Sequence, residues 1–157
     1  MDRRNAKMLL IVGTCAFAAT VGTRIYLGGA VPSPDTVHAQ GTDQTSLLGR
    51  LIYGEARGEP YVGQVAVGAV VVNRTSNPAF PKTIAGVIFQ PGAFDAVSDG
   101  QIWSGLDSQN LQAAQAAVAG WDPSGGSLYY WNPATATSPW IWSRRIVARI
   151  GKHFFGI

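Results

Sequence analysis

At residues 47–60 the chain reads LLGRLIYGEARGEP, a run whose apolar residues recur at helical spacing. Glu55 lies three residues after Ile52 on the same apolar stripe, and Gly58 and Pro60 stop the helix within the next turn. A carboxyl group on the apolar side of a helix end is partly desolvated. Desolvation disfavours the anion and raises the pKa. We therefore expect Glu55 to hold its proton more tightly than an ordinary glutamate.

The sequence on both sides of this run predicts a mostly helical α+β domain with a small sheet. Polar residues at 42–46 cap the first helix. Apolar spacing, caps and Gly or Pro stops then predict helices over 61–74, 83–89, 107–119 and 143–150, a short strand over 128–131, and loops at 90–94 and 121–126. Ser143 caps the last helix, which is basic.

Residues 61–74 carry two conflicting signals. Their many valines favour a strand by propensity, whereas fourteen residues between Pro60 and the Asn77-Pro78 stop favour a helix. We predict a buried helix, in which Gly63, Gly68 and neighbouring alanines let another element approach closely.

Residues 1–39 are predicted to lie outside this domain. A positively charged start is followed by fourteen mainly apolar residues over 8–21, which suits a signal peptide better than a membrane span of roughly 20 residues. Small residues place a cleavage site after Ala39. The alternative is an uncleaved membrane anchor over 8–31 with a short tether. In both cases residues 40–157 form one exported domain.

Composition limits the partners of residues 40–157. The only cysteine is Cys15, so no disulfide stabilises the domain. The chain has a net charge of +3, but four basic and two acidic residues lie before residue 40, which leaves +1. No nucleic-acid footprint is therefore expected. A local excess of positive charge occurs at Arg144, Arg145, Arg149 and Lys152. It is interpreted as a solvated helix face or as a site that attracts an anionic polymer.

Scarce residue types exclude several chemistries. A zinc site needs about three protein ligands, and residues 40–157 contain the single histidine His153. A Cys–His peptidase has no cysteine to use, and His153 has no nucleophile elbow nearby for a serine triad. No phosphate-binding glycine loop is present. The sequence therefore predicts a site without metal or cofactor, and His153 as a packed or surface residue.

Carboxylates remain as the candidates for proton transfer. The only glutamates are Glu55 and Glu59, and Glu59 is interpreted as an acid that favours the start of the next helix. The aspartates of the domain are Asp43, Asp95, Asp99, Asp107 and Asp122. Two-carboxylate glycosidases need pairs about 5–5.5 Å or 6.5–9.5 Å apart. Glu55 is the best single candidate for the catalytic acid.

Aromatic residues predict a saccharide groove. All five tryptophans, Trp103, Trp121, Trp131, Trp140 and Trp142, lie in the last 55 residues. Flat sugar faces pack on such rings, although tryptophans also fill cores. We expect two or three in the core, and Trp140 and then Trp131 in the groove. Side chains that hold sugar hydroxyls are predicted to be Gln90, Asn73, Tyr129 and Asn132.

Six stretches together resemble the SleB-type cell wall hydrolases, the spore cortex-lytic enzymes of endospore formers. They are residues 54–60, 63–70, 73–74, 83–94, 120–126 and 140–144, and the similarity covers the chain in order from Leu48 to Phe155. The resemblance implies a lysozyme-like lytic transglycosylase domain, with Glu55 as catalytic acid and the glycan strand of peptidoglycan as substrate. It also implies a role in spore germination or wall turnover.

One departure from that family concerns wall binding. Many members carry an N-terminal peptidoglycan-binding repeat, whereas only a tether of some twenty residues precedes the domain in this sequence. Wall affinity is then expected from the groove, from a membrane anchor, or from an accessory germination or membrane protein. Three alternatives stay open: a hydrolytic muramidase with an Asp partner, a metal-dependent amidase disfavoured by the missing ligands, and a non-catalytic wall-binding module.

Overall fold

The computed structural model describes residues 34–157, with side chains from residue 43. The predicted signal peptide or anchor before residue 34 lies outside this part of the chain. Within residues 34–157, no helix has both the length and the apolar character needed to cross a membrane.

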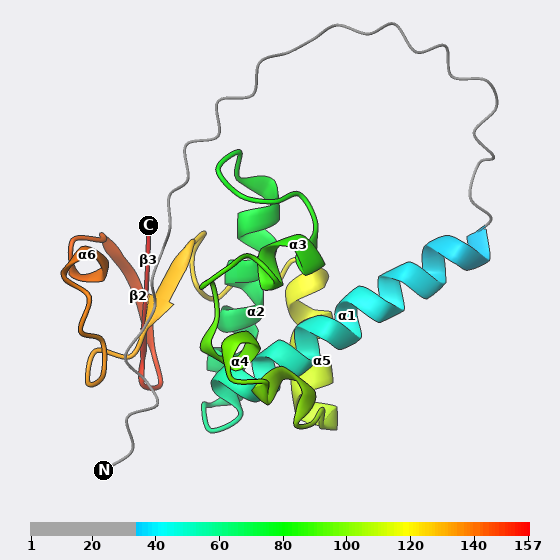
Figure 1. Ribbon diagram of the computed structural model, residues 1–157, viewed down its shortest axis with the longest axis horizontal. Helices are drawn as coiled ribbons and strands as arrows, with labels where there is room; N and C mark the ends of the chain where they lie inside the picture. The colour runs from blue at the N-terminus through cyan, green and yellow to red at the C-terminus, as the bar shows by residue number, and fades with distance from the viewer. Residues whose placement is uncertain (1–33) are drawn as a thin grey trace, which may run out of the picture.

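Three helices form the core: α1 (Pro34–Ala56), α2 (Tyr61–Ser76) and α5 (Ser108–Val118) (Figure 1). The prediction that α1 starts at caps in 42–46 is wrong, because the helix already begins at Pro34. Proline suits a first turn, where its missing N–H has no helical partner. The domain boundary predicted at residue 40 falls within α1 and stays a prediction.

α2 confirms the predicted buried helix over the competing strand. Its side chains from Val65 to Val71 are buried, and Gly68 lies where α2 meets both neighbouring helices. A Cβ atom added at Gly68 would lie 3.0 Å from Ala117 Cβ of α5 and 3.1 Å from Ile52 Cδ1 of α1. Helix length and stops thus outweighed the β-propensity of the valines, because valine is tolerated in a helix whose apolar faces are packed.

Gly68→Val is expected to destabilise the domain by about 1–3 kcal/mol, because the added side chain overpacks the junction of three helices. Chemical denaturation with unfolding followed by circular dichroism measures this loss. Gly58→Ala is the matched control, since a Cβ atom there meets nothing within 4 Å. Equal stability of the Gly68 variant and the wild type would show that the helices are not closely packed here.

Short helices connect this core to the rest. α3 (Ile84–Ile88) is capped by Thr83, whose Oγ1 accepts a hydrogen bond from Gly86 N at 3.0 Å. It is followed by α4 (Asp95–Ser98) and the 3₁₀ helix η1 (Gln101–Trp103), which the sequence did not predict. The predicted helix over 107–119 is α5, and its cap is Asp107, which accepts from Asn110 N at 2.7 Å.

The sheet has three antiparallel strands in the order β1-β3-β2, and in Figure 1 it stands beside the helical part. The strands are β1 (Tyr129–Trp131), β2 (Ile146–Ile150) and β3 (His153–Gly156), with the short helix α6 (Pro139–Trp142) between β1 and β2. Tyr130 pairs with Phe155, and Ile150 pairs with His153 across the tight turn. The predicted strand at 128–131 is confirmed.

The predicted basic helix over 143–150 is wrong, because residues 146–150 form β2. The β-branched Ile146, Val147 and Ile150 suit a strand, and Gly151 with φ of +58° closes a hairpin onto β3. Trp140 lies in α6, which the sequence analysis did not predict. The basic residue Arg149 therefore belongs to the sheet and not to a helix face. Its guanidinium lies over the Phe154 ring, 4.7 Å from the ring centroid.

Candidate active site

A cleft of about 1670 Å³ lies between the helical part and the sheet. One wall comes from the end of α1 and from α4 and η1, and it includes Glu55, Asp95 and Gln101. The other comes from the sheet and the loop after β1, including Tyr130 and His153. The cleft exceeds the roughly 300–1,000 Å³ of small-ligand pockets, so it suits a polymer.

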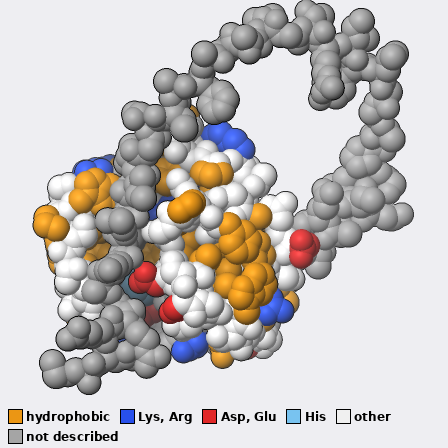
Figure 2. Space-filling view, in the orientation of Figure 1, with side chains coloured by type: hydrophobic (Ala, Val, Ile, Leu, Met, Phe, Trp, Pro, Cys, Tyr) orange, Lys and Arg blue, Asp and Glu red, His pale blue; other side chains and the backbone are white. Residues whose placement is uncertain are grey.

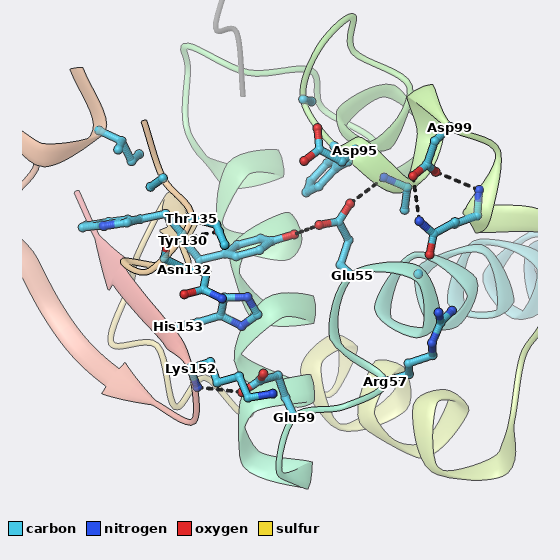
Figure 3. A pocket seen from close by; sticks show the side chains of 18 of the residues that line it. Glu55, Arg57, Glu59, Asp95, Asp99, Tyr130, Asn132, Thr135, Lys152 and His153 are labelled. Carbon is cyan, nitrogen blue, oxygen red and sulfur yellow. Dashed lines mark hydrogen bonds between the residues drawn. The ribbon is translucent and has the colours of Figure 1, made fainter. Parts of the chain in front are cut away.

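Glu55 is held at the base of this cleft by two hydrogen bonds. Its Oε1 accepts from the backbone N–H of Ala96 at 2.8 Å, and its Oε2 accepts from the Tyr130 hydroxyl at 3.0 Å. Figure 3 shows the phenol of Tyr130 pointing from the sheet toward the carboxyl group on α1. The carboxyl group is therefore fixed between elements that are far apart in sequence.

Burial raises the pKa of Glu55 above its ordinary value of 4.5. The hydrogen bonds from Ala96 and Tyr130 act in the opposite direction, because they stabilise the anion, while the negative charges of Asp95 and Asp99 raise the pKa further. Desolvation dominates the balance, as the apolar stripe of the first helix predicted. Such a group can deliver a proton at a pH where an exposed glutamate is ionised.

Two aspartates accompany Glu55 on the helical wall. Asp95 is half-buried at the start of α4, and its pKa is raised by burial and then by the charge of Asp99. Asp99 is exposed and accepts hydrogen bonds from the backbone and side chain of Gln101 at 3.0 and 2.7 Å. In Figure 3 both aspartates lie on the same side of Glu55.

Tyr130 is a site residue that the sequence analysis missed. Its ring is buried against Phe94 and Phe155, and burial followed by the Glu55 charge raises the pKa of its hydroxyl well above the ordinary value. It therefore stays a hydrogen-bond donor. Tyr130 lines the cleft, whereas the adjacent Tyr129 does not. Sequence alone had no signal that distinguishes the two.

Arg74 of α2 is fully buried next to the residues that precede and begin β1. Its Nε donates to Leu128 O at 2.8 Å, just before β1, and its guanidinium faces the rings of Phe80, Phe94 and Tyr129 at 5.1–5.7 Å. Burial lowers its pKa. Neither Nη1 nor Nη2 has a hydrogen-bond partner among the described residues, so ring faces supply the contacts of this cation.

The structure brings only part of the predicted substrate-binding set to the cleft. Trp131, Asn132 and Trp140 line it together with Glu55, whereas Gln90, Asn73 and Tyr129 are not among its lining residues. The Asn73 amide donates to Asp122 Oδ2 and Ser127 O at 3.0 and 3.1 Å. Tyr129 packs its ring edge-on against Trp140, with centroids 5.1 Å apart.

The tryptophans are less buried than expected. Only Trp131 belongs to the buried residues, and Trp140 is half-buried under the Arg144 guanidinium at 4.5 Å. Trp103, Trp121 and Trp142 are exposed. The expectation of two or three core tryptophans is wrong, because small aliphatic residues of α1, α2 and α5 fill the core instead.

Glu59 and His153 form the opposite end of the cleft (Figure 3). Glu59 does not lie in the first turn of α2, so its interpretation as a helix-start acid is wrong. Its Oε2 instead accepts from the backbone N–H of Lys152 at 2.8 Å, which ties the β2–β3 turn to the helical part. Burial lowers the pKa of His153, whose buried Nδ1 has no partner among the described residues.

The described residues contain no group of three or more His, Cys, Asp or Glu side chains that could hold a metal ion. The carboxyl and imidazole groups that line the cleft are Glu55, Asp95, Asp99, Glu59 and His153. Among them, Glu55 accepts hydrogen bonds from donors on two other elements, the backbone N–H of Ala96 and the Tyr130 hydroxyl. This arrangement can donate a proton and then stabilise the resulting carboxylate.

Two solved structures are similar to this one. The catalytic domain of the Bacillus cereus SleB protein is 51% identical with a TM-score of 0.69, and the match covers 73% of this chain and 90% of that chain. The catalytic domain of the germination-specific lytic transglycosylase SleB from Bacillus anthracis is 50% identical with a TM-score of 0.70, over 73% and 94% of the two chains. The predicted fold class is thereby confirmed.

Curated relatives agree with these structures. The chain is 58% identical over 109 residues to the spore cortex-lytic enzyme of Bacillus subtilis, and 51% identical over 127 residues to that of Oceanobacillus iheyensis. It spans 36% and 46% of these two relatives, and 69% and 81% of its own length is matched. Cell wall hydrolase CwlJ of Bacillus subtilis is 32% identical over 116 residues, which cover 81% of that protein and 69% of this chain.

The model of the Cell Wall Hydrolase family matches residues 58–156, which include the wall of the cleft that carries Tyr130 and His153. Glu55 lies three residues before the matched segment. The family match covers more than half of the chain, and this protein belongs to the cell wall hydrolase family.

Proposed function

We propose that this chain cleaves the glycan strands of peptidoglycan after N-acetylmuramic acid, with Glu55 as the acid and then the base of a lytic transglycosylase reaction. The observation that carries the proposal is a glutamate with a raised pKa at the base of a large cleft, between two hydrogen-bond donors. The similar protein from Bacillus anthracis is named a lytic transglycosylase, which supports this reaction type.

In the first step, protonated Glu55 donates its proton to the glycosidic oxygen as the bond from that oxygen to C1 breaks. Positive charge develops on the C1–ring-oxygen unit of the muramic residue. The carboxylates of Asp95 and Asp99 on the same wall favour that positive charge. The Glu55 carboxylate that remains is stabilised by the hydrogen bonds from Ala96 N and the Tyr130 hydroxyl.

In the second step, the Glu55 carboxylate removes the proton of the C6 hydroxyl of the same sugar. The C6 oxygen forms a bond to C1, which gives an anhydro ring and returns Glu55 to its protonated form. A carboxyl group whose pKa is raised by burial suits both roles, as the acid of the first step and the base of the second. The reaction consumes no water and needs no cofactor.

Mass spectrometry of fragments released from purified peptidoglycan tests this function. The proposed reaction gives anhydro-muramic ends, whereas a hydrolytic muramidase gives reducing ends that are heavier by one water. The second outcome has a structural basis, because Asp95 lies in the cleft and could activate a water molecule. Free stem peptides that disappear with a chelator would indicate an amidase, and wall binding without any fragment would indicate a binding module.

The biological setting is part of the proposal. Relatives named spore cortex-lytic enzymes support the spore cortex as the wall layer attacked, during germination. Such a substrate lies outside the cytoplasm, in agreement with the predicted export segment before residue 40. Anchoring through residues 8–31 and an accessory germination or membrane protein remain predictions.

Asp95→Asn is expected to move the alkaline limb of the pH profile of kcat/KM to lower pH. The Asp95 charge raises the pKa of Glu55, so its removal lowers that pKa and decreases the protonated fraction at neutral pH. Initial rates of fragment release between pH 4 and 9 measure the shift. Asp43→Asn, on the exposed surface of α1, is the control and leaves the profile in place. An unmoved limb in the Asp95 variant would remove this residue from the site.

A further inference from the structure

We propose that the exposed aromatic pair Phe89 and Trp103 is a second saccharide-binding surface, which continues the cleft beyond η1 and holds the glycan strand outside the reaction centre. The inference rests on the proposed function, since it extends the same substrate across the rim of the same cleft.

The two side chains of the pair are exposed and contact each other. Phe89 is 47% and Trp103 63% accessible, and their rings stack with centroids 6.4 Å apart and planes 23° apart. Trp103 is the most exposed large hydrophobic residue in the described part of the chain. Clustered exposed apolar side chains on a soluble domain mark a binding surface. Figure 2 shows hydrophobic side chains gathered over the helical part, next to the acidic side chains near the cleft.

The geometry of η1 connects the pair to the cleft. A 3₁₀ helix has three residues per turn, so Gln101 and Ser104 share one face, and both line the cleft. Trp103 follows on an adjacent face of η1 and is exposed, but it is not among the lining residues of the cleft. The position of Gln101 is fixed, because its backbone and side-chain N–H groups donate to Asp99 at 3.0 and 2.7 Å. Because Trp103 lies between the two cleft-lining residues Gln101 and Ser104 in sequence, a strand that leaves the cleft past η1 is the occupant proposed for the aromatic pair.

The chemistry of this rim fits a glycan. The C–H faces of pyranose rings and the methyl groups of N-acetyl substituents pack on an indole plane. Gln101 and Ser104 supply an amide and a hydroxyl beside that plane, as sugar hydroxyls and acetamido groups require. Because the cleft alone holds only part of a long strand, contact outside it adds affinity for polymers and little for short fragments.

The chain contains a matched control for this surface. Trp121 is 46% exposed and also pairs with an aromatic ring, that of Tyr61, with centroids 5.9 Å apart and planes 48° apart. Neither Trp121 nor Tyr61 lines the cleft. Trp121→Ala therefore removes another exposed, ring-paired indole without touching the proposed path of the strand.

The test compares Trp103→Ala with Trp121→Ala on two substrates, long glycan strands and a purified tetrasaccharide fragment. For Trp103→Ala the ratio of kcat/KM on long strands to kcat/KM on the fragment is expected to fall about tenfold, the size of an aromatic contact. Phe89→Ala lowers the ratio in the same direction, and Trp103→Tyr, which keeps an aromatic face, restores most of it. Trp121→Ala leaves the ratio unchanged.

Binding measured without turnover separates this inference from the proposed reaction. Cosedimentation of the Glu55→Gln protein with purified peptidoglycan gives an apparent Kd, and adding Trp103→Ala is expected to weaken it about tenfold. If the wild type cleaves no glycan, the reaction fails while this measurement still decides the surface. Equal binding by the Trp103 and Trp121 variants in the Glu55→Gln background overturns the inference, whatever the reaction.

Discussion

Glu55→Gln is expected to lower kcat/KM for peptidoglycan cleavage about 10³- to 10⁴-fold, because a single group supplies both proton transfers. The amide fits the site: its oxygen can accept from Ala96 N, and its NH₂ group can donate to the Tyr130 oxygen, which sits 3.0 Å from Oε2 in the wild type. The loss of turbidity of a wall suspension and the release of fragments measure the effect.

The same variant carries its own control for folding. Burial raises the pKa of Glu55, so the folded state favours the protonated form, and the stability this confers is lost as the pH rises through the folded-state pKa. Glutamine stays neutral at every pH. At pH 7 we therefore expect the unfolding temperature of Glu55→Gln to equal or exceed that of the wild type, with the difference vanishing below about pH 4.5. A folded variant with wild-type lysis would refute the catalytic role.

Tyr130→Phe is expected to lower kcat/KM about 10- to 100-fold, because the carboxylate formed in the first step loses one of its two donors. The hydrogen bond from Tyr130 lowers the pKa of Glu55, so its removal raises that pKa and moves the alkaline limb of the pH profile upward. This direction is opposite to that of Asp95→Asn. The two variants together distinguish an effect on Glu55 from general damage to the site.

Tyr129→Phe is the matched control, since it removes a hydroxyl from the adjacent residue of β1, which does not line the cleft. We expect kcat/KM to change less than about twofold and the pH profile to stay in place. If Tyr129→Phe and Tyr130→Phe lower activity equally, without a change in the profile, the hydroxyl of Tyr130 does not act on Glu55.

Local sequence patterns determined the helical core and the central candidate of the site. Helical spacing and the stops at Gly58 and Pro60 predicted the end of α1, and they placed Glu55 on its buried face. Caps such as Asp107 predicted α5, and stop signals resolved α2 against the strand propensity of its valines. These features depend on neighbours within one or two turns, which the sequence records directly.

Long-range pairing decided what the sequence did not reveal. Residues 146–150 form β2 because β3 is there to pair with them, and a basic run carries no signal of that partner. Asn73 was predicted to hold sugar hydroxyls, and Asp122 was one of the carboxylates considered for proton transfer. In the fold the Asn73 amide donates a hydrogen bond to the Asp122 carboxylate at 3.0 Å. Contacts between residues dozens of positions apart leave no spacing pattern to detect.

The chain by itself therefore determined that a desolvated glutamate would end an amphipathic helix, since burial of one helical face follows from local periodicity. Only the tertiary structure decided which groups surround that glutamate. Tyr130 lies 75 positions away in sequence, and the N–H of Ala96 lies 41 away. Packing of the sheet against the helices brings both donors within hydrogen-bond distance of one carboxyl group. Side chains that are far apart in sequence thereby form one site around Glu55.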